Sequence, residues 1–177
     1  GKYPMDVPFA DGGPGMIIPG STLVTEPVDN QPVMYRAFMV MSNELVTPKV
    51  LWCPKDKYHF VASNWTERTT GNLAGGFWMA SVSYFLDADA EESKPQMLLT
   101  GDAFLGPDDA RVYTIVTLVP ANTAVWGLAQ WNKTLSHQGN GNVSLADGSA
   151  HQLTSSGLMR QLESSGDPWN LLLLPWN

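Results

Sequence analysis

The strongest local structural signal in the sequence lies in His137-Gln-Gly-Asn-Gly-Asn-Val-Ser-Leu-Ala-Asp147-Gly148, which is followed by Ser149-Ala-His-Gln-Leu153. Asp-Gly between two short segments of alternating polarity is a strong hairpin signal. Glycine adopts a positive φ without a Cβ clash, and aspartate tolerates the turn. We therefore expect a β-hairpin over 142–153 with its tip at 147–148.

Two registers fit this hairpin. A two-residue loop would place Leu145 opposite Ala150, whereas a three-residue loop that includes Ser149 would place Val143 opposite Leu153. We favour the second register, because it gathers Val143, Leu145 and Leu153 on one buried face.

Composition favours a single domain over the whole chain, 1–177. With 177 residues, a mass of 19.3 kDa and 44% hydrophobic residues, the chain is long enough to bury a substantial core. Only 15% of the residues are charged, and the formal net charge is -7. Because this acidic chain has no cluster of Lys and Arg, we expect neither nucleic acid nor an anionic lipid surface as a partner.

Cys53 is the only cysteine, so the chain can form no internal disulfide and no cysteine-based metal site. We expect it to be a buried structural thiol. No apolar run approaches the roughly eighteen residues that span a bilayer, and no signal peptide is evident. Because the chain begins at Gly1 rather than at a methionine, we expect the natural protein to extend further upstream.

The first part of the chain is rich in Pro and Gly, so we expect an extended segment over 1–30. One main helix should follow over about 31–46. Asp29 and Pro32 suit a helix start, and an apolar stripe recurs at spacings of three and four residues. A second, short helix is expected over about 156–164.

Several short segments have the β-branched and aromatic content of strands, and they include 77–86, 96–100 and 111–119. Successive strands with only two helices predict an α+β domain. Its sheet should be mainly antiparallel, with helix 31–46 packed on one face and hairpin 142–153 within it.

The residues that could carry chemistry form no strong catalytic pattern. Ser136, His137 and Asp147 could be imagined as a triad, but Ser136 lacks the sharp turn that exposes a nucleophile. The three histidines also lack the spacing of metal ligands. We therefore expect polar or hydrogen-bonding histidines and no enzymatic activity.

Two acidic segments offer oxygen ligands for a hard cation such as calcium. Neither has the glycine turn and spacing of an EF-hand loop, and a solvated acidic loop is the commoner outcome. We expect no cofactor, with calcium as the single candidate. The carboxylates are Asp87, Asp89, Glu91 and Glu92 in one segment and Asp102, Asp108 and Asp109 in the other.

Seven tryptophans in 177 residues are many. Exposed aromatic rings could stack on sugars, so an exported ligand- or carbohydrate-binding module is an alternative function. Most of these tryptophans lie beside expected strands or at the chain end, where packing in a core or an interface accounts for them.

Nine residues separate His137 from Asp147-Gly148, and Asn142 lies between them. This spacing resembles the C-terminal motif of prepilin-type proteins, in which a histidine, nine residues and Asp-Gly follow one another.

The segment 43–56 ends in Cys53-Pro54-Lys-Asp56 and is similar to a helix-to-strand segment of the same group. Shorter likenesses lie at 81–85 and at 95–102. With the hairpin motif, these segments make the chain resemble type IV pilin-like proteins and type II secretion pseudopilins of bacteria such as the Verrucomicrobia.

The resemblance implies a pilin-like fold and a non-enzymatic structural subunit of a type II (general) secretion pathway or a type IV pilus-like assembly. It implies other pilin-like subunits, secretion-system proteins and secreted cargo as partners. In that family a long hydrophobic helix at the N-terminus anchors the protein in the inner membrane, and this sequence lacks that helix. The implied location is the periplasmic or cell-surface side of that membrane.

For the motif residues we expect structural roles and no catalytic one. Asp147 and Gly148 should form the turn, and the side chain of His137 should make a hydrogen bond that closes the loop ahead of it. The same structural set includes Asn142, Cys53, Pro54 and Asp56.

Overall fold

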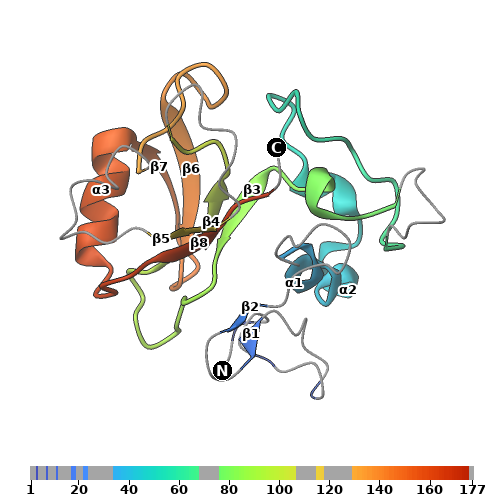
Figure 1. Cartoon of the computed structure of the whole chain (residues 1–177), viewed down its shortest axis with the longest axis horizontal. Helices are drawn as coiled ribbons and strands as arrows, with labels where there is room; N and C mark the ends of the chain where they lie inside the picture. Colours follow the sequence, from blue (N-terminus) through green and yellow to red (C-terminus); the bar gives the residue numbers. More distant parts are fainter. Residues whose placement is uncertain are drawn as a thin grey trace. The chain divides into compact units, whose positions relative to one another are not determined.

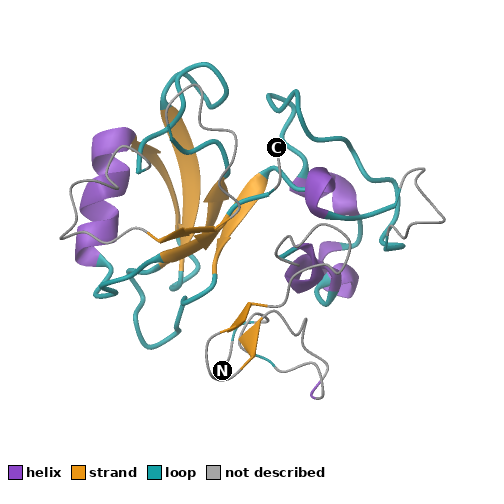
Figure 2. Cartoon of the chain, in the orientation of Figure 1, coloured by secondary structure: helices purple, strands orange, loops and turns teal. Residues whose placement is uncertain are grey.

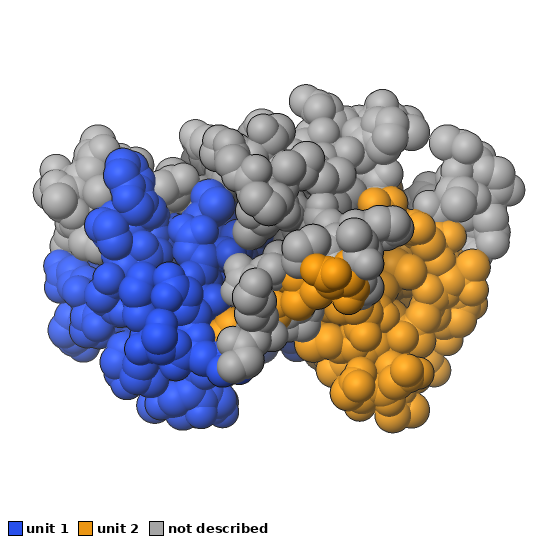
Figure 3. All heavy atoms as spheres, turned by 90° about the horizontal axis from the view of Figure 1, so that it is seen from below, with its two compact units in different colours: residues 1, 84–174 blue, residues 2–83, 175–177 orange. Residues whose placement is uncertain are grey.

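The computed structural model describes residues 3, 7, 11, 17–18, 22–23, 34–67, 76–106, 115–117 and 129–175. The chain divides into two compact units, which Figure 3 shows in different colours. Unit 1 comprises residues 1 and 84–174, and unit 2 comprises residues 2–83 and 175–177. The expectation that residues 1–177 form a single domain remains a prediction, because the division into compact units does not test it.

Unit 1 is built on a six-stranded sheet in which all neighbouring strands are antiparallel. The strands lie in the order β5-β8-β3-β4-β6-β7 (Figure 1). The C-terminal strand therefore lies between β5 and β3, and the hairpin of β6 and β7 ends the sheet. The strands are β3 (Tyr84–Asp87), β4 (Leu98–Asp102), β5 (Ile115–Thr117), β6 (Asn140–Leu145), β7 (Ala150–Thr154) and β8 (Leu171–Leu173).

The hairpin of β6 and β7 is present, but both expected registers are wrong. Val143 lies opposite His151, and Ser144 lies opposite Ala150. The favoured register is off by two residues, so the side chains keep their faces. Val143 and Leu145 are buried, and Leu153 packs against the same core cluster.

The hairpin loop explains the register. The amide of Leu145 donates to the carbonyl of Ser149 at 2.9 Å, and the amide of Gly148 donates to the carbonyl of Leu145 at 2.9 Å. The loop therefore consists of residues 146–148, one position earlier than the expected three-residue loop. Gly148 has a φ of 82°, the left-handed conformation that closes three-residue hairpin loops.

The core of unit 1 lies between the sheet and α3 (Ser155–Ser164), which Figure 1 shows beside β7. Thr154 caps this helix by accepting a hydrogen bond from the amide of Gly157 at 3.1 Å. Leu158 and Leu162 enter the core from the helix. The buried strand residues that join them there are Phe85, Leu98, Val143, Leu145 and Leu172.

The helices of unit 2 are short (Figure 2).

An aromatic cluster packs inside unit 2. Phe77 is fully buried, and its ring centroid lies 6.1 Å from that of Tyr35 and 4.9 Å from that of Trp65. The Tyr35 hydroxyl donates to Glu67 at 2.6 Å. The elements of unit 2 are β1 (Ile17–Ile18), β2 (Thr22–Leu23), α1 (Tyr35–Met39), α2 (Ser42–Leu45) and the 3₁₀ turns η3 (Pro48–Leu51) and η4 (Met79–Ser81).

The expected fold class, a pilin-like α+β domain packed by one main helix over 31–46, is wrong. An antiparallel sheet dominates, and the longest helix of the described chain is α3, with 10 residues. The region 34–46 breaks into α1 and α2 at Met41, whose φ of -96° and ψ of 16° leave the helical range. Val40, Ser42 and Asn43 surround the break, and all three residue types have low helix propensity.

The remaining expectations fall partly outside the described residues. Most of the extended segment 1–30 and the flanks of the expected strand 111–119 lie outside them, and 115–117 is described as β5. In unit 2, the expected strand start at 77–83 forms the η4 turn and an extended connection instead, and β3 begins at Tyr84.

Gly141 on β6 faces the ring of Trp131 so closely that a Cβ would lie 2.6 Å from three ring atoms. Trp131 is only 2% exposed and has little room to move. We expect Gly141→Ala to lower the free energy of unfolding by about 1–3 kcal/mol, the usual cost of overpacking a core, as measured by urea titration.

Gly157→Ala is the matched control, because a Cβ there meets its nearest neighbour at 3.4 Å, near ordinary contact distance. This substitution should leave stability unchanged or raise it, since alanine favours a helix over glycine. Equal stability of the Gly141 variant and the unchanged protein would contradict the packing described for β6.

Candidate functional site

Asp102 joins the hairpin motif to the middle of the sheet. It is the last residue of β4 and is 5% exposed. Its Oδ2 accepts a hydrogen bond from the backbone amide of Asn142 at 2.7 Å and another from the Asn142 side-chain amide at 3.2 Å. Hydrogen bonds to an ionised carboxylate are stronger than neutral ones, so this residue ties β6 to the end of β4.

His137 lies at the entry to the hairpin. Its Nε2 is 3.9 Å from Oδ2 of Asp102, beyond hydrogen-bond distance, and 39% of its side chain is exposed. The carbonyl of His137 accepts from the backbone amide and the side-chain amide of Asn140, each at 3.3 Å. The backbone of His137 therefore closes the loop, and its imidazole adds a solvent-screened contact with Asp102.

Asp147 and Gly148 form the turn at the far end of β6. The Asp147 carboxylate accepts from the amide of Ser149 at 2.8 Å. Hydrogen bonds from the side chain and backbone of Ser149 hold the pKa of Asp147 below its usual value. The amide of Asp147 also donates to the carbonyl of Pro95 at 3.3 Å, which fixes the tip to the segment before β4.

Cys53, Pro54 and Asp56 form a turn in unit 2. The amide of Asp56 donates to the carbonyl of Cys53 at 2.8 Å, and Pro54 takes the second position of the turn, where its fixed φ fits. Cys53 is partly buried, less than the sequence predicts. Its own amide donates to Oγ of Ser83 at 3.0 Å.

The turn places the Asp56 carboxylate, which is 4% exposed, at the centre of a buried polar network. Oδ1 accepts from the amides of Tyr58 and His59 at 2.9 and 3.0 Å. Oδ2 lies 2.5 Å from Nδ1 of His59 and accepts from the hydroxyl of Ser83 at 2.6 Å. Four donors therefore surround one carboxylate.

The Asp56 network resembles a catalytic triad in composition but not in geometry. Burial alone would raise the pKa of Asp56, but the hydrogen bonds from His59 and Ser83 and the charge of His59 hold it below its usual value. The Ser83 hydroxyl donates to the carboxylate rather than to the imidazole. A serine held in this way is not activated as a nucleophile, which needs a base as its acceptor.

The triad imagined from the sequence does not assemble either. The Ser136 hydroxyl is buried and donates to the carbonyl of Asn132. Asp147 lies at the hairpin tip and is engaged by Ser149, whereas His137 lies at the opposite end of β6 near Asp102.

The acidic residues considered as candidate calcium ligands do not gather into a cation site within the described part of the chain. Across the described ranges, no group of three His, Cys, Asp or Glu side chains is placed to hold a metal ion. Asp108 and Asp109 lie outside those ranges. Asp102 is engaged by Asn142, and Asp87 is buried in the sheet.

Sequence reasoning missed the partners of the motif carboxylates. Ser83 lies 27 residues from Asp56 in sequence, and Asp102 lies 40 residues from Asn142. No local pattern predicts such pairs, because the tertiary fold brings together residues that are far apart in sequence. His59 is different, since an aspartate three residues ahead of a histidine at a Cys-Pro turn is a local signal that could have been read.

The hairpin anchor predicts unequal effects of two alanine substitutions. Asp102→Ala removes the carboxylate that accepts from both amide groups of Asn142 and should lower the free energy of unfolding by about 1.5–3 kcal/mol, the usual contribution of hydrogen bonds to a charged group. His137→Ala removes a partly exposed contact with Asp102 and should cost less than about 1 kcal/mol. Chemical denaturation of both variants measures this, and a larger loss for His137→Ala would contradict the assignment.

The Asp56 network predicts that the Asp56→Asn variant is destabilised. The side-chain NH2 group introduced by this substitution is a donor, and it would face two other donors, His59 and Ser83. We expect a loss of at least about 2 kcal/mol near pH 7. The folded-state pKa of Asp56 is lowered, so its contribution is full above the ordinary value and is lost as pH falls through the folded-state value.

Denaturation curves at pH 7 and at pH 3 test both parts of the Asp56 prediction. The difference between the Asp56→Asn variant and the unchanged protein should shrink at the lower pH. Glu163→Gln on the exposed side of α3 is the control and should match the unchanged protein at both values. A difference that persists undiminished at pH 3 would contradict the ionised state of Asp56.

No match to this chain was found among protein-family models, curated proteins or solved structures. Within the described residues, no helix has the length and apolar character needed to cross a bilayer. The likeness to prepilin-type proteins therefore rests on the sequence motifs.

Proposed function

We propose that the chain is the head of a non-enzymatic structural subunit that resembles a pseudopilin of a type II secretion pathway or a subunit of a type IV pilus-like assembly. One observation carries the proposal: the motif that runs from His137 to Gly148 serves to build and anchor one hairpin. Asn142 and Asp147 are both engaged inside unit 1. Such use of polar residues suits a scaffold subunit.

The spacing of the motif has a physical account that supports this proposal. The nine residues after His137 comprise a short loop, β6 and the first loop residue, Ala146. His137 therefore marks the end of β6 near Asp102, and Asp147 marks the hairpin tip. The spacing of the motif therefore corresponds to the length of β6, and the residues at its two ends hold that strand within the sheet.

The proposal implies partners and a location. Other pilin-like subunits and secretion-system proteins would contact the head, and secreted cargo would be a further partner. An N-terminal hydrophobic helix upstream of Gly1 would anchor the protein in the bacterial inner membrane. The head would then lie on the periplasmic or cell-surface side.

A second candidate is an exported ligand- or carbohydrate-binding module, and Trp169 favours it. Its side chain is 60% exposed on unit 1, in contrast to Trp131, which is buried. An exposed indole ring can stack on a sugar. A glycan that quenches tryptophan fluorescence in the unchanged protein but not in a Trp169→Ala variant would favour this candidate over the structural subunit.

The structural-subunit proposal is tested on the full-length reading frame expressed in its source cell. Mass spectrometry of the membrane-bound protein should find a short basic leader removed directly before about twenty apolar residues, enough to span a bilayer. Cross-linking should join the head to pilin-like subunits. An ordinary cleaved signal peptide, or a native start near Gly1 with no membrane association, would contradict the proposal.

A further inference from the structure

Asp87 is a buried carboxyl group with an open hydrogen-bonding position. It is the last residue of β3, is 0% exposed and lies opposite Leu172 of β8. Its Oδ1 accepts from the amide of Asp89 at 3.0 Å. Its Oδ2 has no hydrogen-bond partner within the described part of the chain. A buried polar atom left in this way costs free energy, most of all when it is charged.

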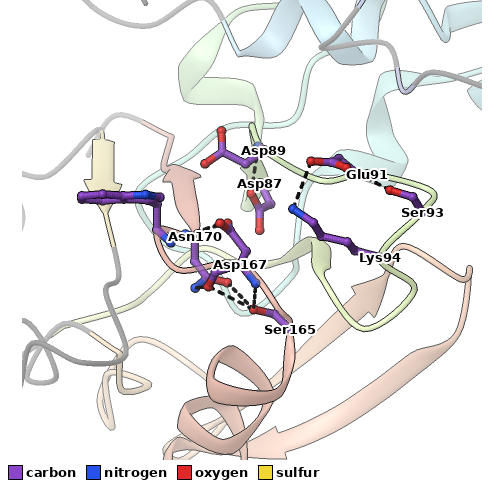
Figure 4. Close-up of polar contacts among 9 residues, drawn as sticks. Asp87, Asp89, Glu91, Ser93, Lys94, Ser165, Asp167 and Asn170 are labelled. Atoms are coloured by element: carbon purple, nitrogen blue, oxygen red, sulfur yellow. Dashed lines mark hydrogen bonds and ion pairs between the residues drawn. The ribbon is translucent and has the colours of Figure 1, made fainter.

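The charged groups around Asp87 come from two segments. Asp89, Glu91 and Lys94 follow β3, and Asp167 comes from the loop between α3 and β8 (Figure 4). The Lys94 ammonium is 3.1 Å from Glu91, and the carboxylates of Asp167 and Asp89 add to the charges that raise its pKa. The neighbouring strand β8 contributes only leucines.

Asp167 organises the loop that covers this corner. Its carboxylate accepts from the amides of Trp169 at 3.1 Å and Asn170 at 2.7 Å. The Ser165 hydroxyl lies 3.1 Å from Oδ1 of Asn170, and the Asn170 side chain donates to the carbonyl of Asp167 at 2.9 Å. The loop 165–170 is therefore held by its own polar groups, and none of these hydrogen bonds involves Asp87.

The surroundings of Asp87 favour its neutral form. Burial raises the pKa of Asp87 to about 8, although the amide of Asp89 opposes the shift. The charges of Asp89 and Asp167 raise it further. Near neutral pH the folded protein therefore holds a neutral carboxylic acid at the junction of β3 and β8.

We propose that Asp87 is a pH-sensitive latch that keeps the junction of β3, β8 and the loop 165–170 closed while it is neutral and opens that junction when it ionises. An ionised Asp87 would have two carboxylates, Asp89 and Asp167, as neighbours and, among the described residues, no donor for its Oδ2. The nearby ammonium of Lys94 is paired with Glu91. Opening the junction admits water, which can form hydrogen bonds with the ionised carboxylate of Asp87. The latch concerns unit 1 alone and does not depend on the proposed function.

The sign of the pH dependence follows from the two states. The closed state keeps the proton up to about pH 8, whereas Asp87 in the opened state has an ordinary acidity near the reference value of 3.8. Opening therefore releases a proton between these values. The opening equilibrium should rise up to about tenfold per pH unit in that window and level off above pH 8.

Hydrogen exchange measured by NMR tests the latch in the whole chain. Protection factors, corrected for the intrinsic pH dependence of exchange, should be followed at Ala88, whose amide donates to the carbonyl of Leu171 at 2.8 Å, and at Trp169 and Asn170. In the unchanged protein they should fall by up to about tenfold per unit between pH 5 and pH 8. An Asp87→Asn variant, which cannot ionise, should show a flat profile, and the exposed control Glu163→Gln should behave like the unchanged protein.

A second measurement keeps the proposal testable if Asp87→Asn does not fold. The carbon-13 shift of the Asp87 carboxyl group in the unchanged protein should titrate with a midpoint near pH 8, at the point where protection levels off. A midpoint near pH 4, or protection factors at Ala88 and Asn170 that change less than twofold between pH 5 and pH 8, would overturn the proposal. An Asp87→Asn variant that keeps the pH dependence would also overturn it.

Discussion

The hydrogen bonds from Asn142 to the carboxylate of Asp102 are the interaction on which unit 1 depends most. They connect the end of β4, a central strand, to β6, which carries the hairpin. The residues beside them are glycines with aromatic neighbours. A Cβ on Gly101 would lie 2.7 Å from the ring of Phe85, and one on Gly141 would lie 2.6 Å from the ring of Trp131. The polar anchor and the close packing of two rings therefore fix β4 and β6 together.

Two carboxylates within the described chain show how surroundings decide the role of one residue type. Asp56 is buried among four donors, which hold it ionised and make it the centre of a turn. Asp87 is equally buried, but it accepts one hydrogen bond within the described chain and has acidic neighbours, so it keeps its proton near neutral pH. The first stabilises a fixed structure, and the second couples a structure to pH.

Local sequence signals predicted the local structure. Asp147-Gly148 correctly indicated a hairpin, and Ser155-Ser156 lie at the start of α3 near the expected helix start. The exact register was not predictable, because either a two-residue or a three-residue loop satisfies the alternating pattern of β6. The main helix over 31–46 failed for a physical reason. Its apolar stripe was real at Ala37 and Phe38, which are buried, but weak helix formers near Met41 interrupt the backbone.

The tertiary partners were beyond sequence reasoning. The sequence indicates Asp102 as a weak candidate for a cation ligand, whereas in the structure it anchors Asn142. The sequence places Asp87 in a solvated acidic loop, whereas in the structure it is buried beside β8. In each case the deciding fact is which strand lies next to which, and the chain reaches that arrangement only by pairing segments far apart in sequence.

A double-mutant cycle between Asp102 and Asn142 tests the central claim, that the motif builds and anchors the hairpin. The cycle compares the unfolding free energies of Asp102→Ala, Asn142→Ala and the double variant, and it isolates the coupling between the two side chains. The same cycle with His137→Ala in place of Asn142→Ala is the reference. The account predicts a coupling energy of about 0.5–3 kcal/mol for Asp102 with Asn142 and a smaller one for Asp102 with His137. Coupling near zero for Asn142, with strong coupling for His137, would contradict it.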